Sequence, residues 1–396
     1  MDMTLHNTDE LDFAHGGPVH RLSHRMFARW GASHSLGTRM AGFLAITWLP
    51  LVVLAAFEGR ALGPSPLESL LMDFGTYARF FLGVPLLLVA EQVVGPRLRS
   101  AGLQFVEGGF VCPADYPAFD RAIARSAKWR ESVWAELIIV TLAMTGAWLF
   151  TAETLTGGEI ASWRSPNSPD SPFGISLTAL WYRLVAVPIL QFFWYRWLWR
   201  LLVWTSFLWS ISQLKLNLVG THADQAGGLG FLGTAHSSLG LFAFALSSVL
   251  SAEAAFLVVF QHAAIESFQI PFVIVLLFVE LMFLGPLLFF TPILVRTRLA
   301  WLRDYSLLVT RYNRTFHEKW ILGKPAAEAS LLGSADIQSL ADLGSSFEYL
   351  RGMKAVPFSL RSIIQLALMA SLPGLPLILL VVPVRQIIEL LSKAVF

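Results

Sequence analysis

Residues 270–294 read IPFVIVLLFVELMFLGPLLFFTPIL, and Glu280 is the only charged side chain among them. A helix needs about 20 predominantly apolar residues to cross the hydrocarbon core of a bilayer. The stretch therefore predicts a transmembrane helix that carries one ionisable group at membrane depth.

Further apolar stretches of similar length lie on both sides of this one. Of the 396 residues, 55% are hydrophobic and 14% are charged, whereas a soluble domain has about 25% charged residues. We therefore expect an all-α polytopic membrane protein with about seven transmembrane helices. The spans are expected at roughly 40–57, 77–95, 133–152, 177–197, 238–260, 270–294 and 360–382.

Counts of six to eight spans stay open. The apolar run 177–219 is long for one span, and Arg196 and Arg200 are expected to mark its inner end. The remainder of that run would be a cytoplasmic extension or a shallow second segment. The last span contains Pro373 and Pro376, which remove helix hydrogen bonds, so it either crosses or re-enters the membrane.

Arginine and lysine residues gather in some connections and are scarce in others, which orients the chain by the positive-inside rule. The expected organisation is a cytoplasmic N-terminal segment (1–39), a bundle of about six spans (40–297) with a cytoplasmic loop (96–132), a small cytoplasmic helical region (298–359), and a last span with an amphipathic tail (360–396). We expect this topology in a plasma membrane or a bacterial inner membrane.

The charge and the cysteine content exclude several classes of function. The net charge of +2 is dispersed, which indicates no nucleic-acid partner. Cys112 is the only cysteine, so an intrachain disulfide and a multi-cysteine metal site are excluded. The sequence predicts no metal site and no cofactor.

A glycine-rich loop within 214–237 contains THADQAGGLGFLG at 221–233. Before it, Leu214, Leu216 and Leu218 alternate with polar residues, which allows a short β element with 104–111 as its partner. The loop contains a G-x-G-x-x-G spacing, but no βαβ unit surrounds it, so we reject a dinucleotide site.

Glycine-rich backbone before a helix can bind an anion through its free N–H groups. The candidate ligand or anion residues are His222, Asp224, Gly227, Gly228 and Gly230. The alternative is a tight loop in which Asp224 caps the local backbone and the glycines allow close packing.

The pattern H-x-D-x-x-G-G-L-G-F-L at 222–232 resembles a segment of an uncharacterised family of bacterial multi-pass membrane proteins. The stretches SADIQSLADL at 334–343 and VPFS at 356–359 are similar to that family too. The resemblance implies a multi-pass membrane fold and no activity.

Ionisable residues inside spans are costly, so each is a functional candidate. Glu280, Glu253 and Arg183 are candidates for a transport path, and Arg183 and Glu253 are expected at depths that allow them to pair. Glu91, Glu136, Arg196 and Arg200 form an expected inner polar cluster. Interhelical salt bridges that fix the packing are the alternative for both groups.

These residues, with the small side chains of 237–255 and the lack of a catalytic motif, favour a membrane conduit, either a channel or a transporter. We expect it to work as a homo-oligomer in the lipid bilayer on a small ion or solute. The alternatives are a membrane-embedded enzyme acting on a lipid-linked substrate through His222 and Asp224, and a sensor or scaffold that recruits partners through 297–357.

Overall fold

The computed structural model describes residues 11, 13, 16, 17, 36–149, 162–164, 176–323 and 335–377. Its α-helices are α2 (Leu36–Thr47), α3 (Leu49–Phe57), α4 (Phe74–Tyr77), α5 (Val84–Glu107), α6 (Tyr116–Arg130), α7 (Val133–Leu149), α9 (Leu177–Trp181), α10 (Val187–Ser212), α11 (Gly230–Ser237), α12 (Gly240–Gln261), α13 (Gln269–Leu284), α14 (Thr291–His317), α15 (Ala335–Arg351) and α16 (Leu360–Ser371). Short π and 3₁₀ segments join or extend them: η2 (Ala78–Gly83), η3 (Pro113–Asp115), η4 (Tyr182–Ala186), η5 (Ile265–Phe268), η6 (Gly285–Phe290), η7 (Glu318–Leu322) and η8 (Leu372–Gly374).

The described part of the chain contains six helices long and apolar enough to cross a membrane, or seven if a bent pair is counted as one span. The six are Leu36–Phe57, Phe74–Glu107, Leu177–Ser212, Gly230–Gln261, Ile265–Leu322 and Leu360–Leu377. The bent pair is Pro113–Arg130 with Val133–Leu149, at 42°. The prediction of a helical chain with about seven such helices is therefore confirmed, whereas the expected amphipathic tail lies outside the described residues.

The expected β element is reduced to a single contact. Val111 and Leu216 form an isolated antiparallel bridge, and Asn217 N donates to Phe110 O at 2.7 Å. Residues up to Glu107 belong to α5 instead of a strand. The described residues thus form no β-strand, because the helix takes most of the segment expected to pair.

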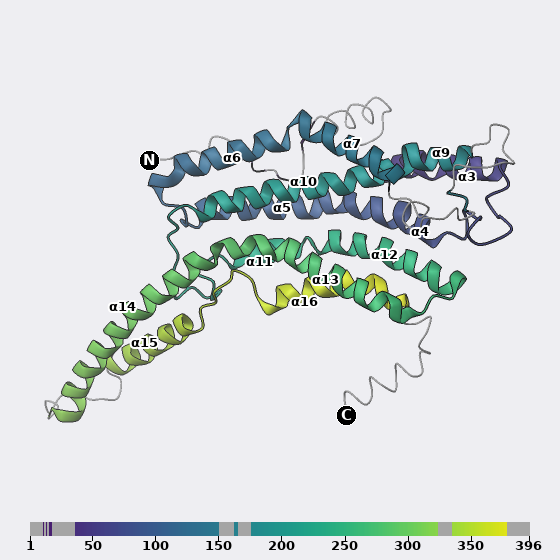
Figure 1. Ribbon diagram of the computed structural model, residues 1–396. Coiled ribbons are helices and arrows are strands. Elements are labelled where there is room, and N and C mark those ends of the chain that lie inside the picture. The colour runs from purple at the N-terminus through teal and green to yellow at the C-terminus, as the bar shows by residue number, and fades with distance from the viewer. Residues whose placement is uncertain are drawn as a thin grey trace, which may run out of the picture.

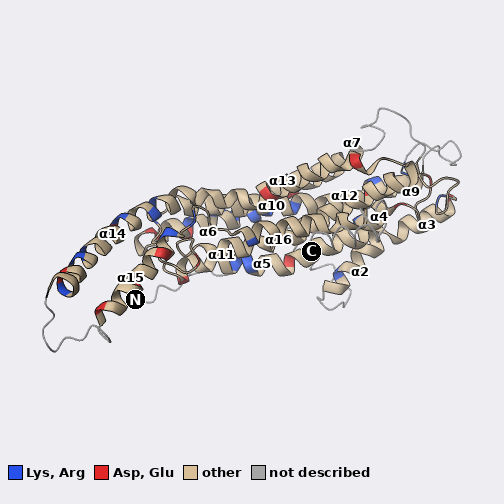
Figure 2. Cartoon of the chain, turned by 90° about the horizontal axis from the view of Figure 1, so that it is seen from below, with Lys and Arg blue, Asp and Glu red and all other residues tan. Residues whose placement is uncertain are grey.

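The helices run along one another in layers (Figure 1). In that view α6 and α7 lie above α5, α9 and α10, and α11, α12, α13 and α16 lie below them. The pair α14–α15 projects beyond the bundle, and we call that end the hairpin end. The opposite end, where α3, α4 and α9 lie, is called the far end. Lys and Arg are frequent on α14, while most of the bundle carries no charge (Figure 2).

The fourth apolar run forms one helix from Leu177 to Ser212, with a π segment inside it. The helix continues past Arg196 and Arg200, whose side chains are buried within the bundle, and the inner end of the span at these arginines stays a prediction. The continuation is the helical extension foreseen for this run, so no second shallow segment follows.

Among the described residues, two of the three π segments stand directly before a Val-Pro pair, whereas η7 is followed by Gly323. Segment η2 ends before Val84-Pro85, and η4 ends before Val187-Pro188. Proline has no N–H to donate to the preceding turn, so the helix widens where that hydrogen bond is missing. These segments carry Arg79 and Arg183.

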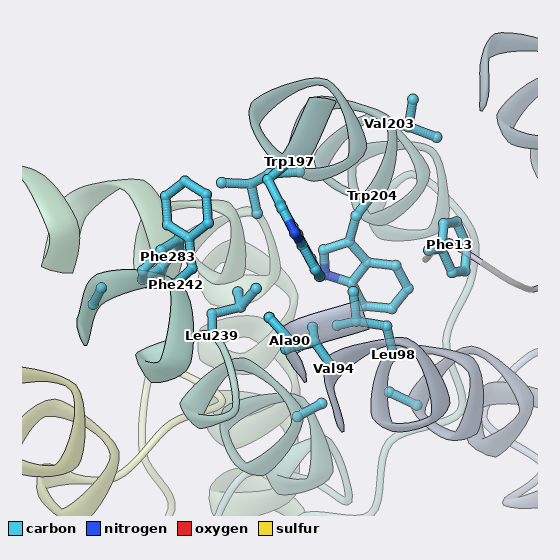
Figure 3. Packing of buried hydrophobic residues seen from close by; sticks show 14 of the residues in the cluster. Phe13, Ala90, Val94, Leu98, Trp197, Val203, Trp204, Leu239, Phe242 and Phe283 are labelled. Atoms are coloured by element: carbon cyan, nitrogen blue, oxygen red, sulfur yellow. The ribbon is translucent and has the colours of Figure 1, made fainter. Parts of the chain in front are cut away.

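Aromatic packing joins the layers at the centre. The Trp204 ring lies edge-on to Phe13 at a centroid distance of 4.7 Å and stacks on Phe207 at 5.4 Å. Figure 3 shows Trp204 of α10 directed toward Val94 and Leu98 of α5, with Phe242 and Phe283 beside Trp197. Since large buried aromatic rings dominate core energetics, this contact holds α5 and α10 together.

Candidate functional site

Glu91 of α5 is fully buried and surrounded by arginines from two other helices. Its carboxylate accepts hydrogen bonds from Arg39 of α2 at 3.0 Å and from Arg200 of α10 at 2.9 Å. Arg196 Nη1 lies 3.9 Å from the same carboxylate. An ionised group inside a bundle must be compensated, so this carboxylate and these arginines fix the register of α2, α5 and α10.

Glu136 of α7 joins this cluster from the other side. It is buried, and it lies close enough to Arg196 to act on that guanidinium electrostatically. Arg196 Nη2 also donates to the carbonyl of Gly16 at 2.9 Å. The structure thus brings together all four residues of the expected inner polar cluster and adds Arg39, which was not among the expected site residues.

A second charged cluster lies at the far end around Asp73, the N-cap of α4. Its carboxylate accepts from Thr76 N at 3.1 Å, from Trp163 Nε1 at 3.0 Å and from Arg164 Nε at 2.9 Å. Burial alone would raise the pKa of Asp73, but Arg164 and Arg79 outweigh it and hold that pKa below 3.8. Asp73 is therefore an anion that ties the 162–164 segment to the start of a helix.

Glu253 of α12 belongs to the same cluster. It pairs with Arg79, and Arg164 Nη2 lies 3.3 Å from it. The expected pairing with Arg183 is wrong, because Arg183 instead donates to the carbonyl of Arg164 at 3.2 Å and lies over the Trp148 ring. Glu253 thus binds α12 to η2 and to the 162–164 segment, and Arg183 binds η4 to the same segment.

The glycine-rich loop is closed by its own aspartate. The Asp224 carboxylate accepts from the backbone N–H groups of Ala226 at 2.8 Å, Gly228 at 3.1 Å and Gly230 at 2.7 Å. The N–H groups that an anion would need therefore bind Asp224 already. This is the arrangement of the tight-loop alternative, so the loop supports no external anion site.

The charge of Asp224 depends on these contacts. Burial would raise its pKa, but the backbone N–H groups and His222 outweigh that effect and lower the pKa below 3.8. His222 Nδ1 lies 2.8 Å from the carboxylate, with the imidazole 46% exposed. Within the described residues no group of three His, Cys, Asp or Glu side chains is arranged to hold a metal ion.

The loop glycines pack against distant segments. Gly227 and Gly228 have φ of +65° and +97°, a backbone region that favours glycine. A Cβ on Gly228 would lie 2.2 Å from the Phe110 ring, and one on Gly233 would lie 2.9 Å from Phe358. Gln225 O also accepts from Lys354 N at 2.7 Å. The loop is thus a junction between α5, α11 and the link that follows α15.

Glu280 of α13 differs from every other candidate. Both of its carboxylate oxygens are buried, and neither has a hydrogen-bond partner. On the same face of α13, Leu276 and Gln269 line a cavity of about 530 Å³ between α12, α13 and α16. Helix spacing places Glu280 one turn beyond Leu276, toward the hairpin end. Ser247, whose hydroxyl is also buried without a partner, lines the same cavity.

Sequence analysis missed several polar residues that these clusters need. Asp73 follows the common rule for an N-cap before a helix, which was a usable signal. His236 is fully buried, accepts from Trp204 Nε1 at 2.8 Å and lies 2.5 Å from Phe283 O. No sequence pattern connects His236 with Trp204 or Phe283, which are 32 and 47 residues away along the chain.

The described residues therefore form two ion-pair clusters, one self-capped loop and one orphan carboxylate that lies one helical turn beyond a cavity. Comparison of the chain with protein-family models, with curated proteins and with solved structures finds no match.

Proposed function

We propose that the chain is a multi-pass protein of a plasma or bacterial inner membrane, with its hairpin end in the cytoplasm, and that it conducts or transports a proton or small cation. The observation that carries this proposal is the orphan carboxylate of Glu280. A buried carboxylate without a donor is destabilised when ionised, and uptake of a proton or a cation relieves that cost.

The surroundings of Glu280 support a path from the far end. The cavity that ends one helical turn before it, at Leu276, is lined by Glu266 and Gln269 near the start of α13, and by Ser247 of α12. Oxygen atoms of this kind can replace part of the water shell of a cation. Glu91 and Glu253 are paired with arginines, so Glu280 is the acidic candidate left to bind a mobile cation.

Flux in liposomes tests the proposal. Purified protein is reconstituted, a potassium or proton gradient is imposed, and internal pH and ion content are followed against empty liposomes. We expect protein-dependent flux that Glu280→Gln largely abolishes. Glu348→Gln, a change on the exposed surface of α15, is the matched control and should conduct normally.

Two results would contradict this assignment. One is a well-folded Glu280→Gln protein that conducts at the same rate as wild type. The other is the absence of protein-dependent flux at every ion, pH and voltage tested. The homo-oligomeric state stays a prediction, which light scattering of the purified protein checks.

One further observation favours a scaffold as the second candidate. The α14–α15 pair projects away from the bundle (Figure 1), and Leu307 and Leu308 are exposed on it. Asp336 of α15 joins the two helices near the end of the pair, since it accepts from Lys319 at 2.5 Å and from Trp320 at 3.0 Å in η7. If this surface recruits a protein, Leu307→Glu should abolish co-purification and leave flux unchanged.

A further inference from the structure

A second cavity lies on the other side of the bundle, between α2, α7 and the η4–α10 helix. Its volume is about 330 Å³. In Figure 1 the α5–α10 layer separates α7 from α13, so this cavity is distinct from the one beside Glu280. Among the described residues, Arg39 and Arg196 are the charged ones that line it, and the other lining side chains are apolar.

The shape of this cavity is that of a groove along α10. Leu184, Pro188, Phe192 and Arg196 line it at four-residue intervals, which spans about 18 Å at 1.5 Å per residue. Val140 of α7 and Leu184 form part of its wall and are about 40% exposed, so the groove is open to the surface of the bundle. An extended apolar chain fits such a groove better than a compact polar solute does.

Among the described residues, arginines outnumber carboxylates around the end of the groove nearer to the hairpin end. Three guanidinium groups, those of Arg39, Arg196 and Arg200, meet two carboxylates there, Glu91 and Glu136, among the described residues. Arg200 Nη2 is buried and has no hydrogen-bond partner. Arg196 is 6% exposed, and its guanidinium carbon lies 6.0 Å from the Phe192 ring that lines the groove.

A buried cation without full compensation is costly, and an anion placed beside it removes that cost. Arginine is the side chain best suited to a phosphate oxygen, since its planar group donates several parallel hydrogen bonds. An apolar groove that ends at arginines therefore matches a ligand with an apolar chain and an anionic head.

We propose that this groove binds an anionic phospholipid of the bilayer, with one acyl chain along α7 and α10 and the phosphate at Arg39 and Arg196. The lipid neutralises the arginine excess and joins α2, α7 and α10 from outside. It is a bound structural lipid, and it takes no part in the path beside Glu280.

Native mass spectrometry of delipidated protein incubated with phosphatidylglycerol or phosphatidylcholine tests this proposal. Wild type should retain phosphatidylglycerol preferentially. The double change Arg39→Gln with Arg196→Gln should weaken retention about tenfold or more, since two charge-assisted contacts are lost. Arg121→Gln, on the exposed face of α6, removes a charge elsewhere and should leave retention unchanged.

A second variant separates lipid binding from folding. Val140→Trp fills the groove from its exposed wall and keeps every arginine, so it should block retention while the protein stays folded. Phosphatidylglycerol should also raise the melting temperature of wild type and not that of Val140→Trp. Equal retention of both lipids by wild type, tight retention by Val140→Trp, or equal protection by inorganic phosphate alone would each overturn the proposal.

Discussion

Removal of the Asp224 carboxylate should destabilise the protein strongly, because three backbone donors depend on it. Ala226, Gly228 and Gly230 donate to it at 2.7–3.1 Å. Hydrogen bonds to a charged group contribute about 1.5–3 kcal/mol each. Water can replace part of this, since the side chain is 21% exposed. We therefore expect Asp224→Ala to lower the free energy of unfolding by about 3 kcal/mol.

Asp224→Asn gives a graded comparison. Its carbonyl oxygen can still accept from Ala226 and Gly228, which both bond to Oδ1, while the Gly230 bond to Oδ2 is lost. The expected cost is about 1–2 kcal/mol. Reversible unfolding in sodium dodecyl sulfate measures both changes, with Asp342→Ala on the exposed face of α15 as the control.

The stability difference between wild type and Asp224→Asn should depend on pH. The pKa of Asp224 is held below 3.8 in the folded protein, so its contribution is present above that pH and is lost as the pH falls through the folded pKa. The stability difference between wild type and Asp224→Asn should shrink below pH 3.8. An Asp224→Ala protein as stable as wild type at pH 7 would refute the reasoning.

Three further perturbations test the packing, each by the free energy of unfolding in the same assay. Arg164→Gln should lower the free energy of unfolding by about 2–3 kcal/mol, because it breaks the ion pair with Asp73 at the start of α4. The Arg164 side chain is 27% exposed, so solvent screens part of the interaction. A loss below about 0.5 kcal/mol would contradict a structural role. Gly228→Ala should cost at least about 2 kcal/mol through its φ of +97° and its contact with Phe110, whereas Gly344→Ala, which meets nothing within 4 Å, should stabilise α15 by about 0.5–1 kcal/mol. Trp204→Phe should cost about 1–3 kcal/mol, because buried His236 loses its donor, and an unchanged stability would show that the imidazole finds another partner.

Apolar length and turn residues were enough to predict the helices. The region 298–359 was expected to be helical, and its described part contains most of α14 and all of α15. The arginines of the fourth helix were expected to mark a membrane interface, whereas the contact of Arg200 with Glu91 was not foreseen. A single sequence shows the charge of Arg200 but not its partner, which lies 109 residues away.

The candidate site was foreseen less completely. Glu280 and the four residues of the inner cluster were named from the sequence. Only the structure shows that Glu280 lacks a hydrogen-bond partner. The partners Arg39, Arg79 and Arg164 were not foreseen, because ion pairing between helices leaves no periodic trace along the chain. The glycine-rich loop was read both as an anion site and as a tight turn, and only the positions of the N–H groups around Asp224 separate the two.

The partners of Glu91 also imply an order of events during synthesis. Arg39 lies 52 residues before Glu91, whereas Arg200 follows it by 109 residues. At about 5–20 residues per second, the ribosome needs roughly 5–20 s to make that interval. If the chain spans a membrane as proposed, the first two long helices can pair during this time and share one positive and one negative charge, which lowers the cost of burying Glu91. The later arginines would then join a carboxylate that already has a partner.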